Sequence, residues 1–326
     1  MKNNLLKYLT KRLFISVVII WGVLTITFFL MHLTPGDPSS VYINPEIDPK
    51  VVSNIRHQMG LDLPLSLQYL SWLRESLSGN FGISFMHKRP VKDVLIDSIP
   101  NTFQLTFLVF IIQLFFGITL GVFMAVKRNT KLDYSLSTFL LFMYSIPGFW
   151  LALTVILIFS LKLGWFPSGQ MNSIGIDDEF WTYLFDRIHH IILPATVLSI
   201  PFIAYTSRFV RGSLAEVLTQ DYMVTTRAYG LSQKKMLFKY ALKNALLPLI
   251  TLAGLYIPFL FGGAVITEYI FSWPGMGRIT IEAIFAHDFP VILATNAIAA
   301  ITVVIGNLIS DILYRIADPR IKYSVT

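Results

Sequence analysis

Apolar residues are concentrated in six long runs, separated by segments rich in polar residues and turn formers. Each run is close to or above the roughly 20 residues that an α-helix needs to cross the hydrocarbon core of a bilayer. The pattern therefore predicts an all-α integral membrane protein with six transmembrane helices. The runs cover residues 13–31, 102–126, 134–161, 191–209, 245–270 and 290–314.

The longest polar segment, residues 32–100, lies between the first and second runs. Proline and glycine indicate several turns in it, the first at Pro35-Gly36-Asp37-Pro38. Two stretches with helical periodicity follow, at 49–59 and 67–77. We expect a buried packing face on the second, where one stripe holds Leu67, Leu70, Leu73 and Leu77.

Lysine and arginine are distributed unevenly among the loops. With both termini in the cytoplasm, 17 of the 26 lie on that side, three lie in short outer loops and six lie in 32–100. Long segments are translocated largely regardless of their charge, so the six lysines and arginines in 32–100 say little about orientation. The distribution predicts cytoplasmic N- and C-termini and an extracytoplasmic segment 32–100. The chain then divides into 1–31 (N-terminal tail and first helix), 32–100 (insertion), 101–314 (membrane core) and 315–326 (C-terminal tail).

Composition excludes several classes of protein. Hydrophobic residues make up 54% of the chain and the mean hydropathy is +0.63, which is typical of a membrane protein and not of an ordinary soluble domain. The net charge of +7 does not indicate nucleic-acid binding, because the positive residues flank the apolar runs without interleaved stacking aromatics. The absence of cysteine excludes disulfides, cysteine nucleophiles and thiolate metal sites.

Motifs for catalysis or for ion-driven transport are missing from the sequence. There is no Gly-Lys-Ser/Thr phosphate loop, no i,i+4 histidine pair and no His-Glu-x-x-His, so we expect no enzymatic activity, no metal site and no bound cofactor in this chain. An ion-driven carrier would need carboxylates near the middle of its spans. Glu268 and Asp311 instead lie toward the ends of their runs. The energy for transport must therefore come from another protein, and an ATP-independent channel or carrier is the remote alternative.

A polar, basic loop at 211–244 separates the fourth and fifth runs. Asp221 is placed to cap a helix at 222–229, and Gly230 follows it as a left-handed stop. Ser232 can cap a second helix. The sequence therefore predicts a helix, a sharp turn and another helix on the cytoplasmic side.

The second helix of this loop is predicted to be amphipathic and basic. Its apolar side holds Met236, Leu237, Tyr240 and Ala241, and its basic side holds Lys235, Lys239 and Lys243. Such a helix is typical either of a charged face beside anionic lipid or of an element that docks on another protein.

Proline and glycine also occur inside three neighbouring runs. There they kink helices and free backbone carbonyls, which neighbouring helices or a water-filled path must satisfy. Such residues can be simple kinks in packed helices without any further role. Their clustering in three adjacent runs, however, fits a translocation path that opens and closes. The residues are Pro147-Gly148, Pro194, Pro201, Pro258 and Gly262-Gly263.

Several blocks of the sequence resemble one family. Residues 221–232 (DYMVTTRAYGLS) and 243–248 (KNALLP) resemble the cytoplasmic coupling loop of permease subunits in binding-protein-dependent ABC importers. The outer stretch 268–290, which includes 271–278 (FSWPGMGR), and Asp318-Pro319-Arg320 match the same family. The closest pattern is the first permease of dipeptide and oligopeptide (peptide/nickel) systems.

This resemblance implies a type I ABC importer (MetI-like) permease fold with an extracytoplasmic insertion after the first helix. It implies a multi-pass protein of a prokaryotic plasma (inner) membrane, in contact with lipid. Its partners would be a homologous second permease, two cytoplasmic ABC ATPases that bind ATP and Mg, and an extracytoplasmic solute-binding protein. The solute would be a di- or oligopeptide. Importers of nickel, glutathione or oligosaccharides on the same scaffold are the alternatives, because the binding protein mainly selects the solute.

The resemblance also assigns two groups of residues. One would couple the permease to the ATPase: Asp221, Tyr222, Val224, Thr225, Thr226, Arg227, Ala228, Tyr229, Gly230, Asn244 and Pro248. The other would line an outer gate or translocation path: Glu268, Trp273, Pro274, Gly275 and Asp288. The sequence departs from the general family at Val224, Thr225 and Thr226, where that family has Glu-Ala-Ala. A salt bridge from a glutamate there is therefore not expected, and Arg227 or Asp221 is the candidate polar anchor.

Overall fold

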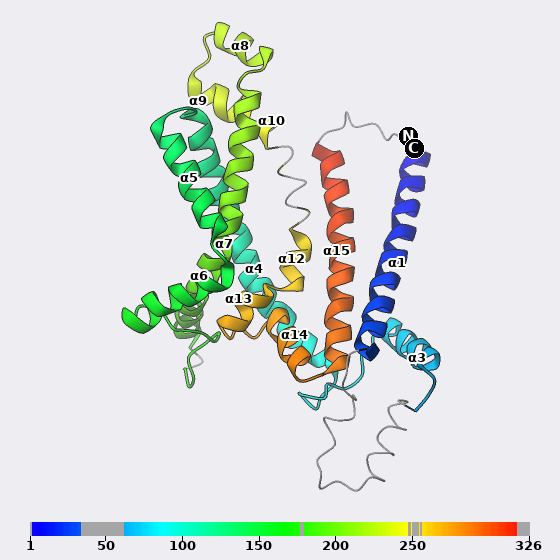
Figure 1. The fold of residues 1–326 in the computed structure, drawn as a ribbon. Helices are drawn as coiled ribbons and strands as arrows, with labels where there is room; N and C mark the ends of the chain where they lie inside the picture. Colours follow the sequence, from blue (N-terminus) through cyan, green and yellow to red (C-terminus); the bar gives the residue numbers. More distant parts are fainter. Residues whose placement is uncertain are drawn as a thin grey trace. The chain divides into compact units, whose positions relative to one another are not determined.

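The computed structural model describes residues 2–33, 62–176, 179–246, 249, 254 and 256–317. Regular structure in these residues is helical, apart from an isolated bridge between Ile83 and Pro90 (Figure 1). The all-α prediction is confirmed. The chain forms two compact units, one made of 1–102, 261–265 and 274–304 and the other of 103–260, 266–273 and 305–326.

Four of the described helices are long and apolar enough to cross a membrane. They contain the first, second, fourth and sixth predicted spans and extend beyond each of them, because helix-forming residues continue past the apolar runs. The prolines at 194 and 201 lie within the fourth span without ending it. These helices are α1 (Lys2–Leu33), α4 (Val91–Val126), α7 (Phe180–Val217) and α15 (Phe289–Ala317).

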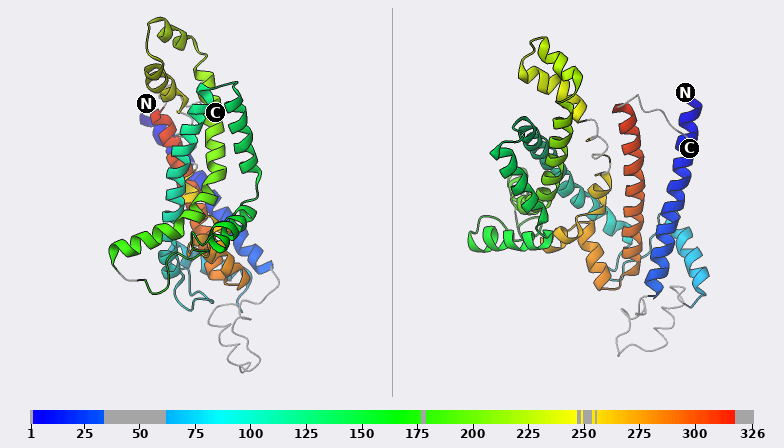
Figure 2. Two further views of the ribbon diagram at one scale, coloured as in Figure 1. Left: turned by 90° about the vertical axis from the view of Figure 1, so that its left-hand side faces the viewer. Right: turned by 45° about the horizontal axis from the view of Figure 1, so that its top comes forward.

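The third predicted span is sharply bent at Pro147-Gly148, where a kink was predicted, and is not one continuous helix. It is divided into α5 (Lys131–Ser145) and a second arm, made of α6 (Gly148–Val155) and the π-helical segment η2 (Ile156–Lys162), and the two arms meet at 95° (Figure 2). Pro147 lies at the corner. Proline has no backbone N–H to donate, so the hydrogen-bond ladder of the helix is interrupted there. Ile146 before it is extended, with φ −72° and ψ 128°, as the residue before a proline prefers.

The fifth predicted span, 245–270, is described only in part. Residues 247, 248, 250–253 and 255 of this range lie outside the described residues. Its described helices are α12 (Ile257–Gly262) and α13 (Val265–Ile270). Gly263 between them has φ +87°, a conformation that glycine adopts without a steric penalty.

The first unit contains α1, α3 (Leu65–Leu77), the start of α4, α14 (Met276–Phe285) and most of α15. One apolar core joins α4, α14 and α15, and it includes Val91, Met276 and Val291. A second core joins α1 to α15 through Phe28, Met31 and Leu293.

The leucine stripe predicted to be buried on α3 is mainly exposed. Leu67, Leu70 and Leu77 are exposed, whereas Tyr69 and Trp72 pack against Phe28 of α1. Tyr69 also shares a hydrogen bond with Thr25, with 2.7 Å between the hydroxyl oxygens. Large aromatic rings thus form the packing face in place of the leucines. The helix predicted at 49–59 and the turn at 35–38 lie outside the described residues.

In the second unit, α4 and α7 approach closely at two glycines. A Cβ atom at Gly117 would lie 2.7 Å from the Thr206 side chain, and one at Gly121 would lie 2.6 Å from Val210. Real Cβ contacts are longer than this, so larger residues would force the two helices apart. Glycines four residues apart commonly permit such a close helix crossing in membranes.

Candidate functional site

The loop that resembles a coupling loop folds as the predicted helix, turn and helix. Its first helix, α8, spans Asp221–Ala228, and Gly230 in the turn has φ +73°. The predicted cap is displaced by one residue. Gln220 occupies the N-cap position without a side-chain hydrogen bond, and Asp221 is the first residue of the helix. A carboxylate there still interacts favourably with the positive end of the helix dipole.

The second helix of the loop is formed by three consecutive segments. These are α9 (Gln233–Lys235), the π-helical η3 (Met236–Ala241) and α10 (Leu242–Ala245). Ser232 occupies the predicted N-cap position, but it accepts the Met236 N–H through its backbone carbonyl at 3.0 Å, and its side chain makes no cap hydrogen bond. The predicted amphipathic pattern is confirmed, because Met236 and Ala241 are buried while the three lysines at 235, 239 and 243 are exposed.

Both helices of the loop are fixed to the end of α7. Met223 of α8 and Met236 of the second helix share an apolar core with Leu214 and Val217 of α7. Hydrogen bonds add to this packing. The Ser213 hydroxyl donates to the Ala245 carbonyl at 2.9 Å. The loop therefore forms one packed piece with the C-terminal end of α7.

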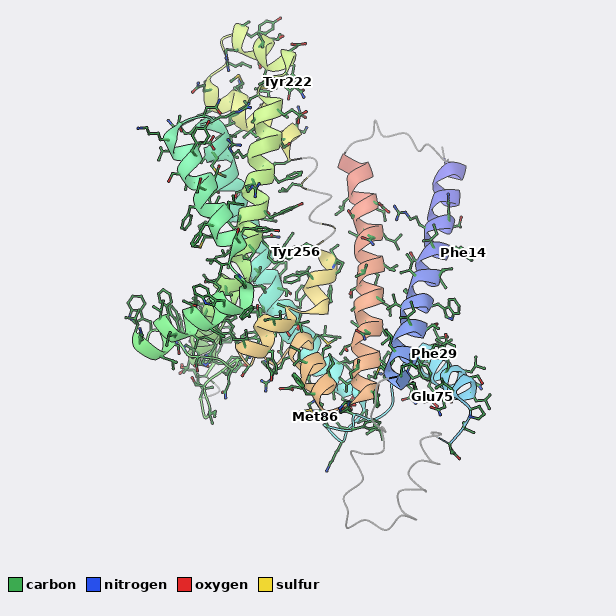
Figure 3. The ribbon with its side chains drawn as sticks, in the orientation of Figure 1. Phe14, Phe29, Glu75, Met86, Tyr222 and Tyr256 are labelled. Carbon is green, nitrogen blue, oxygen red and sulfur yellow. The ribbon has the colours of Figure 1, made fainter. Side chains whose placement is uncertain are left out.

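One hydrogen bond joins two of the residues predicted to couple the permease to its ATPase. Asn244 Nδ2 of α10 donates to the Tyr222 hydroxyl of α8 at 2.9 Å. Tyr222 lies on the side of α8 that packs in the apolar core (Figure 3). These two residues therefore hold the loop together, whereas Pro248 of the same predicted group lies outside the described residues.

The opposite side of α8 and the turn is exposed. Tyr229 is 82% exposed and Val224 is 63% exposed. Arg227 is also exposed, as are Thr225, Ala228 and Gly230. The hydroxyl of Thr225 donates to the Asp221 carbonyl of its own helix at 3.1 Å. Exposed tyrosine and arginine side chains are enriched at protein–protein interfaces, so this side of α8 is the candidate docking surface.

An ion pair that sequence reasoning missed connects this region to α5. Arg211 of α7 binds Asp133 through Nε to Oδ1 and Nη2 to Oδ2, both at 2.6 Å, and Asp133 is completely buried. The backbone N–H of Asn129 also donates to Asp133, at 3.0 Å. Two parallel charge-assisted bonds fix both distance and orientation. The sequence contained one indication of this ion pair: Asp133 lies directly before an apolar run. A carboxylate that is buried at such a position needs a partner.

The predicted outer-gate residue Asp288 is also completely buried. It accepts hydrogen bonds at Oδ2 from the Ser84 hydroxyl at 2.5 Å and from the Met86 N–H at 3.0 Å. Its Oδ1 atom accepts from the Val291 N–H at 3.5 Å, in the first turn of α15. Asp288 therefore ties the segment before α4 to the start of α15, which is a structural arrangement.

The other predicted gate residues are divided between the two units. Glu268 and Trp273 belong to the second unit and are completely buried there, and the Trp273 N–H donates to the Glu268 carbonyl at 2.8 Å. Pro274 and Gly275 belong to the first unit. The Pro274 carbonyl accepts from Asn101 Nδ2 at 2.9 Å, and Gly275 occupies the N-cap of α14.

A cavity of about 480 Å³ lies within the second unit. Sequence analysis named one of its lining residues, Pro201, as a proline that kinks a helix within a run. It missed the aromatic walls, because aromatic residues are spread over all the apolar runs. The lining residues are Phe110, Gln113, Leu114, Tyr144, Pro201, Phe202, Tyr205, Thr206, Leu249 and Tyr256.

Two family matches together cover most of the chain. Residues 117–323 match the family described as "Binding-protein-dependent transport system inner membrane component". Residues 5–106 match the family described as "Binding-prot-dependent transport system membrane comp, N-term".

Similar proteins extend over nearly the full length. The chain is 40% identical to the oligopeptide transport system permease protein AppB of Bacillus subtilis (strain 168), over 97% of this chain and 99% of that protein. It is 34% identical to the glutathione transport system permease protein GsiC of Escherichia coli (strain K12), over 98% of this chain and all of that protein. A solved structure of the MetNI methionine ABC transporter in an inward-facing conformation matches with a TM-score of 0.53 and 18% identity, over 69% of this chain and 96% of that chain. This last likeness shows a shared fold.

Proposed function

The chain belongs to the family of binding-protein-dependent transport system inner membrane components, and from this premise we propose that it is the permease subunit of an ATP-driven importer of di- and oligopeptides. The peptide substrate is supported by the similarity to the oligopeptide permease of Bacillus subtilis. The missing phosphate-loop motif supports a transport subunit that relies on a separate ATPase.

Coupling to the ATPase is assigned to α8 and the turn that follows it. Val224, Arg227 and Tyr229 would enter a groove of the ATPase subunit, because they are exposed while the other side of α8 is packed. Closure of the ATPase pair around ATP would move α8. The packing of the loop on α7 would pass this movement to a membrane-spanning helix. The observation that carries the mechanism is this combination of an exposed docking face and a fixed base.

The assembly would contain a homologous second permease, two ATPase subunits that bind ATP and Mg, and an extracytoplasmic solute-binding protein. The positive-inside bias supports cytoplasmic N- and C-termini and an outer position for residues 32–100. The four described helices of sufficient length and apolarity support a multi-pass protein of the plasma (inner) membrane.

Glutathione is the second candidate solute, supported by the similarity to the glutathione permease of Escherichia coli. To test both, the complete complex would be reconstituted in proteoliposomes and supplied with its binding protein and ATP. We expect ATP-dependent accumulation of labelled di- and oligopeptides. Accumulation of glutathione alone would select the second candidate. Uptake of any solute at the same rate without ATP would contradict the ATP-driven importer itself.

A further inference from the structure

The cavity in the second unit has aromatic walls and few polar groups. Five of its ten lining residues are phenylalanine or tyrosine, and none of the ten is charged. Residues of α4, α5 and α7 line it, together with Leu249 and with Tyr256, which directly precedes α12 (Figure 3). Mostly apolar walls with a small number of polar groups are characteristic of small-molecule binding sites.

Tyr256 presents a buried hydroxyl that has no hydrogen-bond partner among the described residues. The residue is 8% exposed, and its hydroxyl oxygen bonds to no other atom in the described part of the chain. Its ring is held between Phe110, Phe202 and Phe259, with centroid distances of 5.1, 5.1 and 5.0 Å. A buried hydroxyl without a hydrogen-bond partner costs free energy. The three neighbouring rings restrict the movement of the Tyr256 ring toward other polar groups of the protein.

Gln113 adds a second polar group to the same cavity. Its side chain belongs to α4 and the residue is 5% exposed. Among the described residues, no hydrogen bond to its amide is formed. A glutamine amide offers two donor hydrogens and an acceptor oxygen, which is the complement of a peptide group.

We infer that this cavity holds a peptide in transit by its backbone, with the Gln113 amide paired to a peptide group and the Tyr256 hydroxyl donating to a peptide carbonyl. The inference rests on the proposed function and adds the contact site to it. The aromatic walls would cover apolar side chains of the solute. The absence of charge from the walls means that the site does not select for charged side chains, which suits an importer of varied peptides. A lipid acyl chain could fill the apolar volume but would leave both polar groups without a partner.

The first experiment removes each polar group with little change of shape. Tyr256→Phe and Gln113→Leu would be assayed in the reconstituted complex, with Tyr134→Phe as the control, because Tyr134 is an exposed tyrosine of α5 outside the cavity. We expect uptake per complex to fall about five- to tenfold in the first two variants, which corresponds to the net value of one hydrogen bond. ATP hydrolysis stimulated by the binding protein should stay within about twofold of wild type, since the coupling loop is unchanged.

The second experiment introduces charge selectivity. In Gln113→Glu, a carboxylate in the uncharged cavity should favour lysine-containing dipeptides over glutamate-containing dipeptides by at least about tenfold relative to wild type. This ratio does not depend on the amount of complex in the membrane, so a loss of folding cannot produce it.

The outcomes separate the inference from the proposed function. Wild-type uptake of peptides with unchanged uptake in Tyr256→Phe and Gln113→Leu, or an unchanged charge preference in Gln113→Glu, would overturn the contact site alone. A parallel loss of uptake and ATP hydrolysis, or failure of both variants to assemble, would assign the two residues to structure and would also overturn it. No peptide uptake by the wild-type complex would overturn the proposed function, and the contact site with it.

Discussion

The loop at 211–244, predicted to be cytoplasmic, and the segment at 268–290, predicted to lie on the outer side, use their polar residues in opposite ways. In the loop, Arg227 and Tyr229 are exposed, and the contacts that fix the loop come from other residues. In the outer segment, Asp288 is completely buried and accepts hydrogen bonds from Ser84 and Met86. Both regions carry the residue pattern of one family, so pattern alone does not separate residues that bind a partner from residues that hold the fold. Burial and hydrogen bonding do separate them.

The largest expected effect concerns the ion pair that joins α7, just before the loop, to α5. In Arg211→Met, Asp133 would stay buried without its ion-pair partner, and we expect a loss of about 3–5 kcal/mol in stability. The double variant Asp133→Leu/Arg211→Met should recover most of this loss, because an apolar pair leaves no uncompensated charge. Membrane abundance and the thermal unfolding midpoint in detergent measure both. A single variant as stable as wild type would show that this region does not depend on the pair.

The next effect tests whether the outer segment is structural. Asp288→Asn should reduce stability by about 1–3 kcal/mol, because an amide cannot accept all the hydrogen bonds that the buried carboxylate accepts. Abundance on immunoblots should fall while dipeptide uptake per molecule stays normal. Asp93→Asn is the matched control, since Asp93 is exposed on α4. Normal abundance with reduced uptake per molecule would instead give Asp288 a role in the gate.

A smaller effect on stability, but a clear effect on transport, is expected for the turn at Gly230. Gly230 has φ +73° and open space around its Cβ position, so Gly230→Val costs only the backbone strain, roughly 1–2 kcal/mol, or a rearranged turn. We expect normal membrane abundance with weaker stimulation of ATP hydrolysis by the loaded binding protein and reduced uptake. Gly230→Asn should retain more of both activities, because asparagine tolerates this conformation better. Full activity of the valine variant would count against the role of the turn.

The last prediction concerns topology, with residues 32–100 and the loop at 211–244 expected on opposite sides of the membrane, and its variants should leave activity unchanged. The chain contains no cysteine, and Ser66 and Gln233 are exposed. A cysteine introduced at Ser66 should react with an impermeant reagent from outside, and one at Gln233 only after the membrane is opened. Labelling of both from the same side would contradict the predicted topology.

The sequence predicted those parts of the fold that depend on local pattern. Four spans and the helix-turn-helix loop were found because apolar length and turn residues are local properties. Contacts between distant residues were not found. Asp133 and Arg211 are 78 residues apart, and the residues around each of them in the sequence do not indicate that the two form an ion pair. The leucine stripe on α3 failed for a similar reason, because periodicity defines a face but not whether that face meets another element.

The candidate site was predictable to the same extent. The residues predicted to contact an ATPase were named through their motif, and among them Val224, Arg227 and Tyr229 are exposed, as docking requires. The hydrogen bond between Tyr222 and Asn244 and the cavity around Tyr256 required the fold, since each combines side chains from separate elements.

The corner at Pro147 has a consequence for the lipid around the protein. The arm before it, α5, has 15 residues and is therefore about 22 Å long. A bilayer core is about 30 Å thick, so α5 by itself does not reach across an undisturbed membrane. The acyl chains beside α5 must then shorten or tilt to meet it, at a cost of a fraction of a kcal/mol for each ångström of mismatch. We therefore expect lipids with shorter chains to be enriched along this side of the protein, and transport to slow as acyl chains are lengthened.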